Sequence, residues 1–274
     1  MNDRAPTIEG PHMEYKDKVV LIVGASSGIG RTLALRLAGM GAQVVAMARR
    51  EDRLRHLSAE IAARGGRCSL QVADAQDPAA ALRAVQGALA EHGRIDLLML
   101  NAGGAPAIDM RSMTAGEVLG YMRSNYDVAV NVLFPALDAM RRQRSGVVVA
   151  TNSLAGLLGV PLQGPYCAAK GALKLLIDTC RVEFAEFGIR FVSVYPGFIA
   201  TEATADDGMP APLQMSEDRA VDHLLRALQG RYMDYAFPRP MAALVWLANA
   251  LPKRLVVRIL RRDVPPLGPE LRPW

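Results

Sequence analysis

Tyr166 and Lys170 are four residues apart in a segment, residues 153–187, for which we predict a helix in its second half. At this spacing both side chains leave the same helix face, so a phenol and an ammonium can point into one pocket. A free phenol has a pKa near ~10, and a cation a few ångströms away favours the phenolate and lowers that value. We therefore expect Tyr166 to act as a general acid or base. Taken alone, the pattern fits a helix without chemistry equally well.

A glycine-rich turn near the N-terminus is the second segment whose residues could bind a ligand. Residues 24–30 read Gly-Ala-Ser-Ser-Gly-Ile-Gly, between a predicted strand at 18–23 and a predicted helix that follows. Such glycines let the backbone approach a diphosphate, whose charge is stabilised at a helix N-terminus. Because the turn lies between a strand and a helix, we predict a dinucleotide site rather than a merely structural turn.

The next predicted strand, 43–48, ends without the acidic residue that would bind a ribose 2′-hydroxyl, and Arg49 and Arg50 follow it. A guanidinium can grip a 2′-phosphate through charge-assisted hydrogen bonds, which favours NADP(H) as the cofactor. Arg50 fits better as the start of the solvated face of a helix over 51–64. Arg49 is therefore the predicted phosphate ligand.

Candidate residues also follow the other predicted strands, at 67–73, 95–100, 146–152 and 189–195. Strands that alternate with helices predict an α/β fold, here a single Rossmann domain over 16–238 with a doubly wound parallel sheet of about seven strands and helices on both faces. Ligands bind such sheets at the carboxyl ends of the strands, where one crevice could hold all these residues. Asp74 could meet an adenine there, or could equally cap the helix predicted at 79–92.

Composition excludes several function classes. The chain has 274 residues, 51% of them hydrophobic, which is enough for one large core. Its three cysteines and four histidines have neither disulfide nor metal-ligand spacing, so we expect no metal, a reducing cytoplasmic location and histidines on the surface. Residues 1–15 are expected to be a flexible segment, in which His12-Met13 could be a cloning remnant before a natural start.

The net charge of +5 is concentrated in one segment. Six basic residues and no acidic ones lie between residues 239 and 262, leaving 26 basic against 27 acidic residues elsewhere. A basic segment on a neutral body argues against nucleic-acid binding, which needs a charged face with base-reading elements. Such a basic segment is compatible with binding to a membrane surface or to another partner.

Four motifs together resemble the classical short-chain dehydrogenase/reductase family, over roughly residues 16–230. They are Gly24-x3-Gly28-Ile29-Gly30, Asn101-Ala102-Gly103, Ser153 before Tyr166-x3-Lys170, and Pro196-Gly197 followed by Thr201. The sequence departs from the family motifs at two positions, with Val23 in place of the usual threonine and Leu100 in place of the usual first asparagine. In the family these two positions mainly hold the strands to the adjoining loops. Beyond residue 230 the resemblance narrows to a bacterial subset whose chains end in an apolar tail containing Phe-Pro, here Phe237-Pro238.

The resemblance implies that Tyr166 exchanges a proton with the substrate oxygen and that Ser153 hydrogen-bonds this oxygen. Lys170 would lower the pKa of Tyr166 and hold the nicotinamide ribose. Asn125, rather than the nearby Asn131, would keep a helix kink and a water of the proton relay. NADP(H) would carry the hydride. The implied cofactor contacts are Gly24, Ser26, Ser27, Gly28, Ile29, Gly30, Arg49, Asp74, Asn101, Ala102, Gly103, Tyr166, Lys170, Pro196, Gly197, Ile199 and Thr201. Family habit also implies a homodimer or homotetramer.

Residues 198–216, which include Met209, Pro210, Pro212, Leu213 and Met215, are expected to close over the substrate as an apolar lid. An ordinary surface loop is the alternative. The extension 239–274 has leucines at helical spacing, then Pro252, then apolar residues interleaved with arginine. It could lie on an anionic bilayer, or pack on its own domain or a second subunit.

These features predict an NADPH-dependent reductase of a lipophilic ketone or aldehyde. A catalytically idle NADP-binding sensor or scaffold that acts through its tail is the alternative, although it would have no need of a proton relay.

Overall fold

The computed structural model describes residues 14–104, 106–204 and 211–266. The expected flexible segment therefore lies almost wholly outside the described residues, and so do Met209 and Pro210 of the expected lid. Tyr15, at the end of that segment, is buried in the core.

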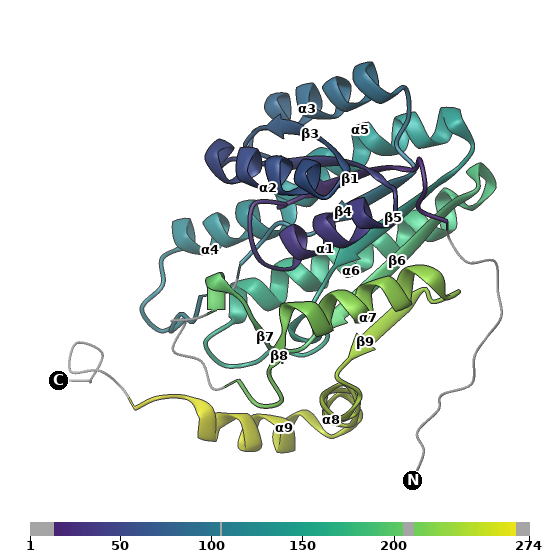
Figure 1. Cartoon of the computed structure of the whole chain (residues 1–274). Coiled ribbons are helices and arrows are strands. Elements are labelled where there is room, and N and C mark those ends of the chain that lie inside the picture. The colour runs from purple at the N-terminus through teal and green to yellow at the C-terminus, as the bar shows by residue number, and fades with distance from the viewer. Residues whose placement is uncertain (1–13, 105, 205–210, 267–274) are drawn as a thin grey trace, which may run out of the picture.

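Seven parallel strands form the central sheet, in the order β3-β2-β1-β4-β5-β6-β9 (Figure 1). The strands are β1 Val19–Val23, β2 Gln43–Ala48, β3 Arg67–Val72, β4 Leu97–Leu100, β5 Gly146–Thr151, β6 Ile189–Pro196 and β9 Asp234–Phe237. The order reverses direction at β1 and β4, as expected of a doubly wound fold. The predicted Rossmann architecture is confirmed.

Helices cover both faces of this sheet. They are α1 Gly28–Gly39, α2 Glu51–Ala63, α3 Pro78–His92, α4 Ala115–Met122, α5 Val128–Gln143, α6 Gly164–Glu183, α7 Glu217–Gln229, α8 Arg239–Ala250 and α9 Lys253–Leu260. Buried side chains of α1, α2 and α7 form one core cluster, and those of α3, α5 and α6 form the other.

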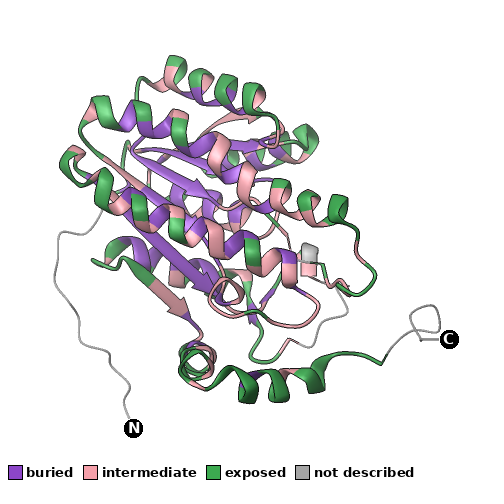
Figure 2. Cartoon of the chain, turned by 180° about the vertical axis from the view of Figure 1, so that it is seen from behind, coloured by how far each residue is buried: buried purple, intermediate pink, exposed green. Residues whose placement is uncertain are grey.

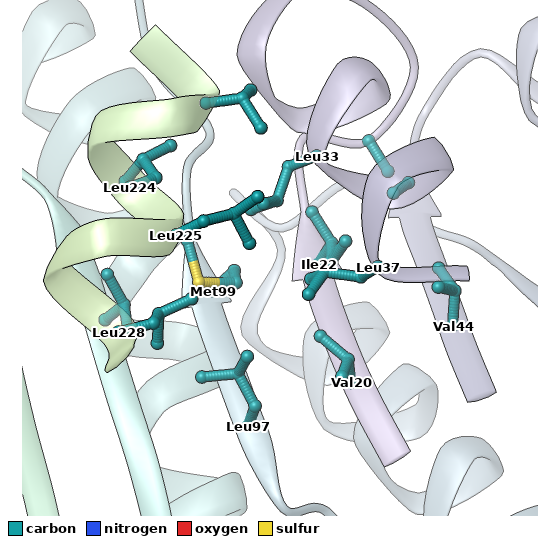
Figure 3. Packing of buried hydrophobic residues seen from close by; sticks show 14 of the residues in the cluster. Val20, Ile22, Leu33, Leu37, Val44, Leu97, Met99, Leu224, Leu225 and Leu228 are labelled. Atoms are coloured by element: carbon teal, nitrogen blue, oxygen red, sulfur yellow. The ribbon is translucent and has the colours of Figure 1, made fainter. Parts of the chain in front are cut away.

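Strand β1 shows why both layers are needed. Successive side chains of a strand point to opposite faces. Val20 and Ile22 accordingly pack with Leu33 of α1 and Leu225 of α7 (Figure 3). The alternate residues of β1 belong to the second cluster. A strand buried on both faces must be apolar throughout, and β1 is Val-Val-Leu-Ile-Val.

The seventh strand, β9, lies in a segment that the sequence pattern leaves unplaced. Phe237, read above only as part of the tail motif, is fully buried and lies opposite Pro196 of β6. His223 of α7 stacks on its ring at 4.6 Å between centroids and hydrogen-bonds the Tyr235 hydroxyl. His223 and the half-buried His92, which hydrogen-bonds Ser69, are therefore not the surface histidines expected, whereas His56 is exposed.

The helical region predicted at 114–144 is continuous but changes its winding. A capping box between Thr114 and Glu117 begins α4, and one turn of π-helix at Arg123–Asp127 joins α4 to α5. Single π-turns inside α-helices occur frequently at functional sites, and this one contains Asn125.

The segment after β6 forms a small second sheet, β7 Ile199–Ala200 with β8 Met215–Ser216. Ile199 and Met215 are buried in the core, so the ends of the expected lid are anchored. Helices α8 and α9 lie together at one end of the molecule, where α9 is mostly exposed (Figure 2). In the described part of the chain, no helix is long and apolar enough to cross a membrane.

Candidate active site

A cleft of about 1000 Å³ lies at the carboxyl ends of the strands. Nearly all predicted site residues line it: Gly24, Ser26, Ser27, Gly28, Ile29, Arg49, Asp74, Asn101, Ala102, Gly103, Ser153, Tyr166, Lys170, Pro196, Gly197, Ile199 and Thr201. Gly30 and Asn125 do not line the cleft. They lie behind its wall, where they support the residues that do.

Two glycines of the turn, Gly24 and Gly30, have no room for a side chain. Gly24 has φ +85°, and a Cβ there would lie 2.9 Å from the backbone of Ala102. At Gly30 a Cβ would lie 2.2 Å from the carbonyl oxygen of Gly24. The turn therefore packs directly against the loop after β4, and the bare backbone forms the floor of the cleft.

The N-terminus of α1 opens into this part of the cleft. Ser27 is the N-cap residue, but its side chain makes no capping hydrogen bond, and the first turn contains no acidic residue. The free N–H groups and the helix dipole thus favour an anion at this point. Together with the missing side chains, they fit the diphosphate of a dinucleotide.

Arg50 lies on the glycine turn rather than on the solvated helix face assigned to it above. Its guanidinium donates to Ser26 Oγ at 3.0 Å and to Ser27 Oγ at 2.6 Å, and it lies 3.7 Å from a carboxylate oxygen of Glu202. The reason is that Arg50 precedes α2 as its N-cap, with an extended backbone that directs it towards α1. Sequence reasoning missed this contact, although the adjacent pair of arginines was a signal.

Arg49 and Asp74 line the cleft next to Arg50. Arg49 is two-thirds exposed and lies 3.9 Å from the Asp74 carboxylate. Asp74 accepts a hydrogen bond from the backbone of Gln76, whereas Asp77 caps α3, so the alternative capping role falls to Asp77. Two guanidiniums thus face the cleft at the carboxyl end of β2.

Ser153 and Tyr166 meet on the opposite side of the cleft. Both hydroxyls line the cleft, and the Ser153 hydroxyl is close enough to lower the pKa of Tyr166. Ser153 Oγ also accepts from the backbone N–H of Ala155 at 3.1 Å. Ser153 follows β5, and Tyr166 lies in the first turn of α6, so the sheet edge and the helix start bring the two hydroxyls together.

Burial raises the pKa of Tyr166 to about 12, and the Ser153 hydroxyl, which lowers this pKa, only partly opposes the rise. The direction is opposite to the expectation that Lys170 would lower this pKa. Burial also lowers the pKa of the Lys170 ammonium to about 8. The Nζ atom lies 5.6 Å from the centre of the Tyr166 ring and donates to the carbonyl oxygen of Thr151 at 2.8 Å. Desolvation is the largest cause of both shifts.

Asn125 is completely buried behind the loop after β4. Its Oδ1 accepts a hydrogen bond of 2.9 Å from the N–H of Gly104, and its amide donates to Tyr121 and Ser124. A Cβ on Gly103 would lie 2.6 Å from this Oδ1 and 3.5 Å from Lys170 Nζ. Asn131, the alternative, instead donates to the carbonyl of Ala75, away from these groups.

The C-terminal helices complete the cleft, which sequence reasoning did not predict. Met241, Leu244 and Val245 of α8 and Leu260 of α9 line it, together with Asp263. A Cβ on Gly197 would lie 2.7 Å from the Met241 sulfur, so Met241 packs directly against the backbone of Gly197. The near absence of polar residues in α8 was the available signal, because such a helix must cover something apolar.

The family model for short chain dehydrogenases matches residues 18–210. The chain belongs to the short-chain dehydrogenase/reductase family. It is 31% identical over 249 residues to an uncharacterized oxidoreductase of Myxococcus xanthus, covering 91% of this chain and 98% of that one. It is 34% identical over 196 residues to L-rhamnose 1-dehydrogenase (NAD(P)(+)) of Azotobacter vinelandii, covering 70% and 77%. The crystal structure of levodione reductase superposes with a TM-score of 0.77 at 26% identity, covering 84% and 99%.

Membership in the short-chain dehydrogenase/reductase family makes the protein an oxidoreductase of a family that uses a nicotinamide cofactor, NAD(P)(H). Homologues in this family act on small-molecule alcohols or ketones. The glycine floor, the free helix N-terminus and the two arginines fit such a cofactor. Among the described residues, no cluster of His, Cys, Asp or Glu could hold a metal ion.

Proposed function

We propose that this protein is an NADPH-dependent reductase that converts a lipophilic ketone or aldehyde to an alcohol, with Tyr166 as general acid and base. The observation that carries the proposal is that the Ser153 and Tyr166 hydroxyls line one cleft beside the buried Lys170 ammonium. A protein that only bound a dinucleotide would not need this group of side chains.

The cofactor supplies a hydride to the carbonyl carbon when it is bound. Ser153 and Tyr166 hold the carbonyl oxygen, and the Tyr166 O–H gives its proton to that oxygen as negative charge develops there. A raised pKa keeps Tyr166 protonated at neutral pH, as a proton donor requires. The nearby Lys170 ammonium then stabilises the phenolate that remains. Asn125 would hold the adjacent loop in place and carry a water of the relay.

The preference for NADPH is supported by the charges at the end of β2. Arg49 and Arg50 line the cleft there, and β2 ends in Ala48 with no carboxylate to bind a ribose 2′-hydroxyl. The opposing carboxylates of Asp74 and Glu202 lie close to these arginines, and a 2′-phosphate would compete with them.

A lipophilic substrate is supported by the lining of the cleft between Ser153 and the C-terminal helices. That part is formed by Leu154, Val160, Phe198, Pro212, Met241, Leu244, Val245 and Leu260. The compared proteins do not decide the substrate class, since one is named for a sugar, L-rhamnose, and another for levodione.

We further propose that the protein is cytosolic and forms a homodimer or homotetramer. Light scattering would test the oligomeric state.

The first test is NADPH oxidation with ketones and aldehydes of increasing chain length, repeated with NADH. We expect turnover to prefer NADPH and to rise with apolar length. Tyr166→Phe should lower kcat by about 10²- to 10⁴-fold while leaving NADPH binding intact. Preference for small polar ketones would overturn the substrate class. Binding of NADPH without turnover of any carbonyl would favour a sensor or scaffold instead.

A further inference from the structure

Helix α8 is apolar on the face that it turns to solvent. Only Ala242 is fully buried, whereas Leu244, Trp246 and Leu247 are 63%, 60% and 57% exposed. The only polar side chain between Pro240 and Ala250 is Asn249, whose amide donates to the carbonyl of Leu157. A helix of this composition normally has both faces covered.

Helix α9 continues the exposed apolar surface after Pro252. Val256 is its only fully buried residue, and Leu255 and Ile259, one turn apart, form an exposed apolar row next to it. Arg254 and Arg258 form the adjacent row at the same i, i+4 spacing. We name the exposed side chains of Leu244, Trp246, Leu247, Leu255 and Ile259 the docking face.

The segment that carries the docking face is positively charged. Arg239, Lys253, Arg254, Arg258, Arg261 and Arg262 are all exposed, and none of them forms an ion pair within the described residues. The segment 239–262 contains no acidic residue to balance them. Unpaired cations around an apolar surface complement a partner that is both negatively charged and apolar.

We propose that the docking face binds the surface of an anionic lipid bilayer, and that apolar carbonyl compounds dissolved in the bilayer enter the cleft from this side. At 12 and 8 residues, α8 and α9 are too short to span a bilayer and instead suit its interfacial plane. A second copy of the chain is a poorer occupant, because a symmetric contact would bring the two sets of unpaired arginines together.

The docking face lies at the edge of the substrate cleft. Leu244 belongs to the face and also lines the cleft, and Leu260 lines it from α9. In Figure 1, α8 and α9 lie at the end of the molecule where β7 and β8 also lie, away from α2 and α3. A protein bound through this face would therefore have the apolar part of the cleft next to the lipid. This delivery step rests on the proposed function.

Flotation of the full chain with vesicles tests the docking. We expect the partition coefficient to be at least about tenfold higher for an equal mixture of phosphatidylcholine and phosphatidylglycerol than for phosphatidylcholine alone, and to fall as salt rises. Arg254→Gln with Arg258→Gln should remove most of this gain. Arg141→Gln with Arg142→Gln on α5 changes the net charge equally and should not.

The apolar part of the contact is tested separately. Leu247→Ser should weaken vesicle binding about fivefold or more, whereas Leu175→Ser, at a similarly exposed leucine of α6, should not. The chain has two tryptophans, so Trp274→Phe leaves Trp246 as the only one. Its emission should shift to the blue with the anionic vesicles and not with the neutral ones.

Three results would overturn the docking: no vesicle binding by the unaltered chain, no effect of the Arg254 and Arg258 substitutions, or a Leu247→Ser variant that changes the oligomeric mass instead of vesicle binding. Neither the arginine pair nor Leu247 lines the cleft, so these variants should turn over a water-soluble ketone normally. Their rate with a long-chain ketone held in anionic vesicles should fall with binding. Vesicle binding without any turnover would refute the proposed function alone, and turnover without vesicle binding would refute the docking alone.

Discussion

The ammonium of Lys170 donates a hydrogen bond of 2.8 Å to the carbonyl oxygen of Thr151, the last residue of β5. This bond ties the catalytic helix α6 to the sheet edge from which Ser153 follows. Lys170 is only 4% exposed, and burial alone accounts for the lowering of its pKa to about 8. No carboxylate in the described part of the chain forms an ion pair with this buried cation.

We expect Lys170→Met to abolish activity and yet to raise the free energy of unfolding at about pH 7 by on the order of 2 kcal/mol, because a buried charge without a counterion is removed. Between the folded pKa of about 8 and the ordinary lysine pKa of 10.5, the unfolded chain holds a proton that the folded protein has lost. The unaltered protein thus gains stability as the pH rises through this range, and the advantage of the variant shrinks. Urea unfolding at about pH 7 and about pH 9.5 measures this, with Lys174→Met, at a lysine paired with Asp178, as the control. A variant less stable at both pH values would show that the ammonium stabilises the fold.

Removing either arginine at the end of β2 should weaken binding of NADPH and spare NADH. Arg49→Ala and Arg50→Ala should each raise the Kd for NADPH about 10- to 100-fold, the loss of one or more charge-assisted hydrogen bonds. Isothermal titration with both cofactors measures this. Arg55→Ala on α2, at an arginine that is paired with Glu51 and does not line the cleft, is the matched control. Equal losses for NADH would mean that the two arginines only shape the glycine turn.

Asn125→Ala should lower kcat about tenfold or more, because the N–H of Gly104 loses its buried acceptor and the loop beside Lys170 is no longer held. Asn131→Ala also removes a hydrogen bond from the same helical region, to Ala75, and should lower the melting temperature without a comparable change in kcat. Steady-state rates and thermal melts of both variants separate the effects. Similar rate losses in the two variants would contradict a positioning role specific to Asn125.

Phe237→Ala should lower the free energy of unfolding by about 3–5 kcal/mol, since it empties a fully buried site in the edge strand β9 and removes the ring stacked on His223. Tyr232→Ala, at a partly exposed ring nearby, should cost about 1 kcal/mol or less. Denaturant unfolding compares them. Equal and small costs would mean that β9 is not an integral part of the core.

Local patterns were sufficient to predict much of this protein. Strand β2 begins and ends where the sequence predicted, because an apolar run is a local pattern. The predicted glycine turn begins directly after β1, although α1 already starts at Gly28, within the predicted turn. The face shared by Tyr166 and Lys170 follows from helix geometry alone. The order in which strands and helices alternate was likewise sufficient to predict a doubly wound parallel sheet.

Only the tertiary structure decided the features that depend on distant neighbours. Arg50 contacts Ser26, which is 24 positions away in the chain, and Ser27, which is 23 positions away. Strand β9 is recognisable only by its pairing with β6. The pKa of Tyr166 rises rather than falls because burial by surrounding segments is the largest influence on it. That the C-terminal helices line the cleft was unpredictable for the same reason. Desolvation and packing depend on every segment that surrounds a site, whereas a sequence pattern describes only one segment at a time.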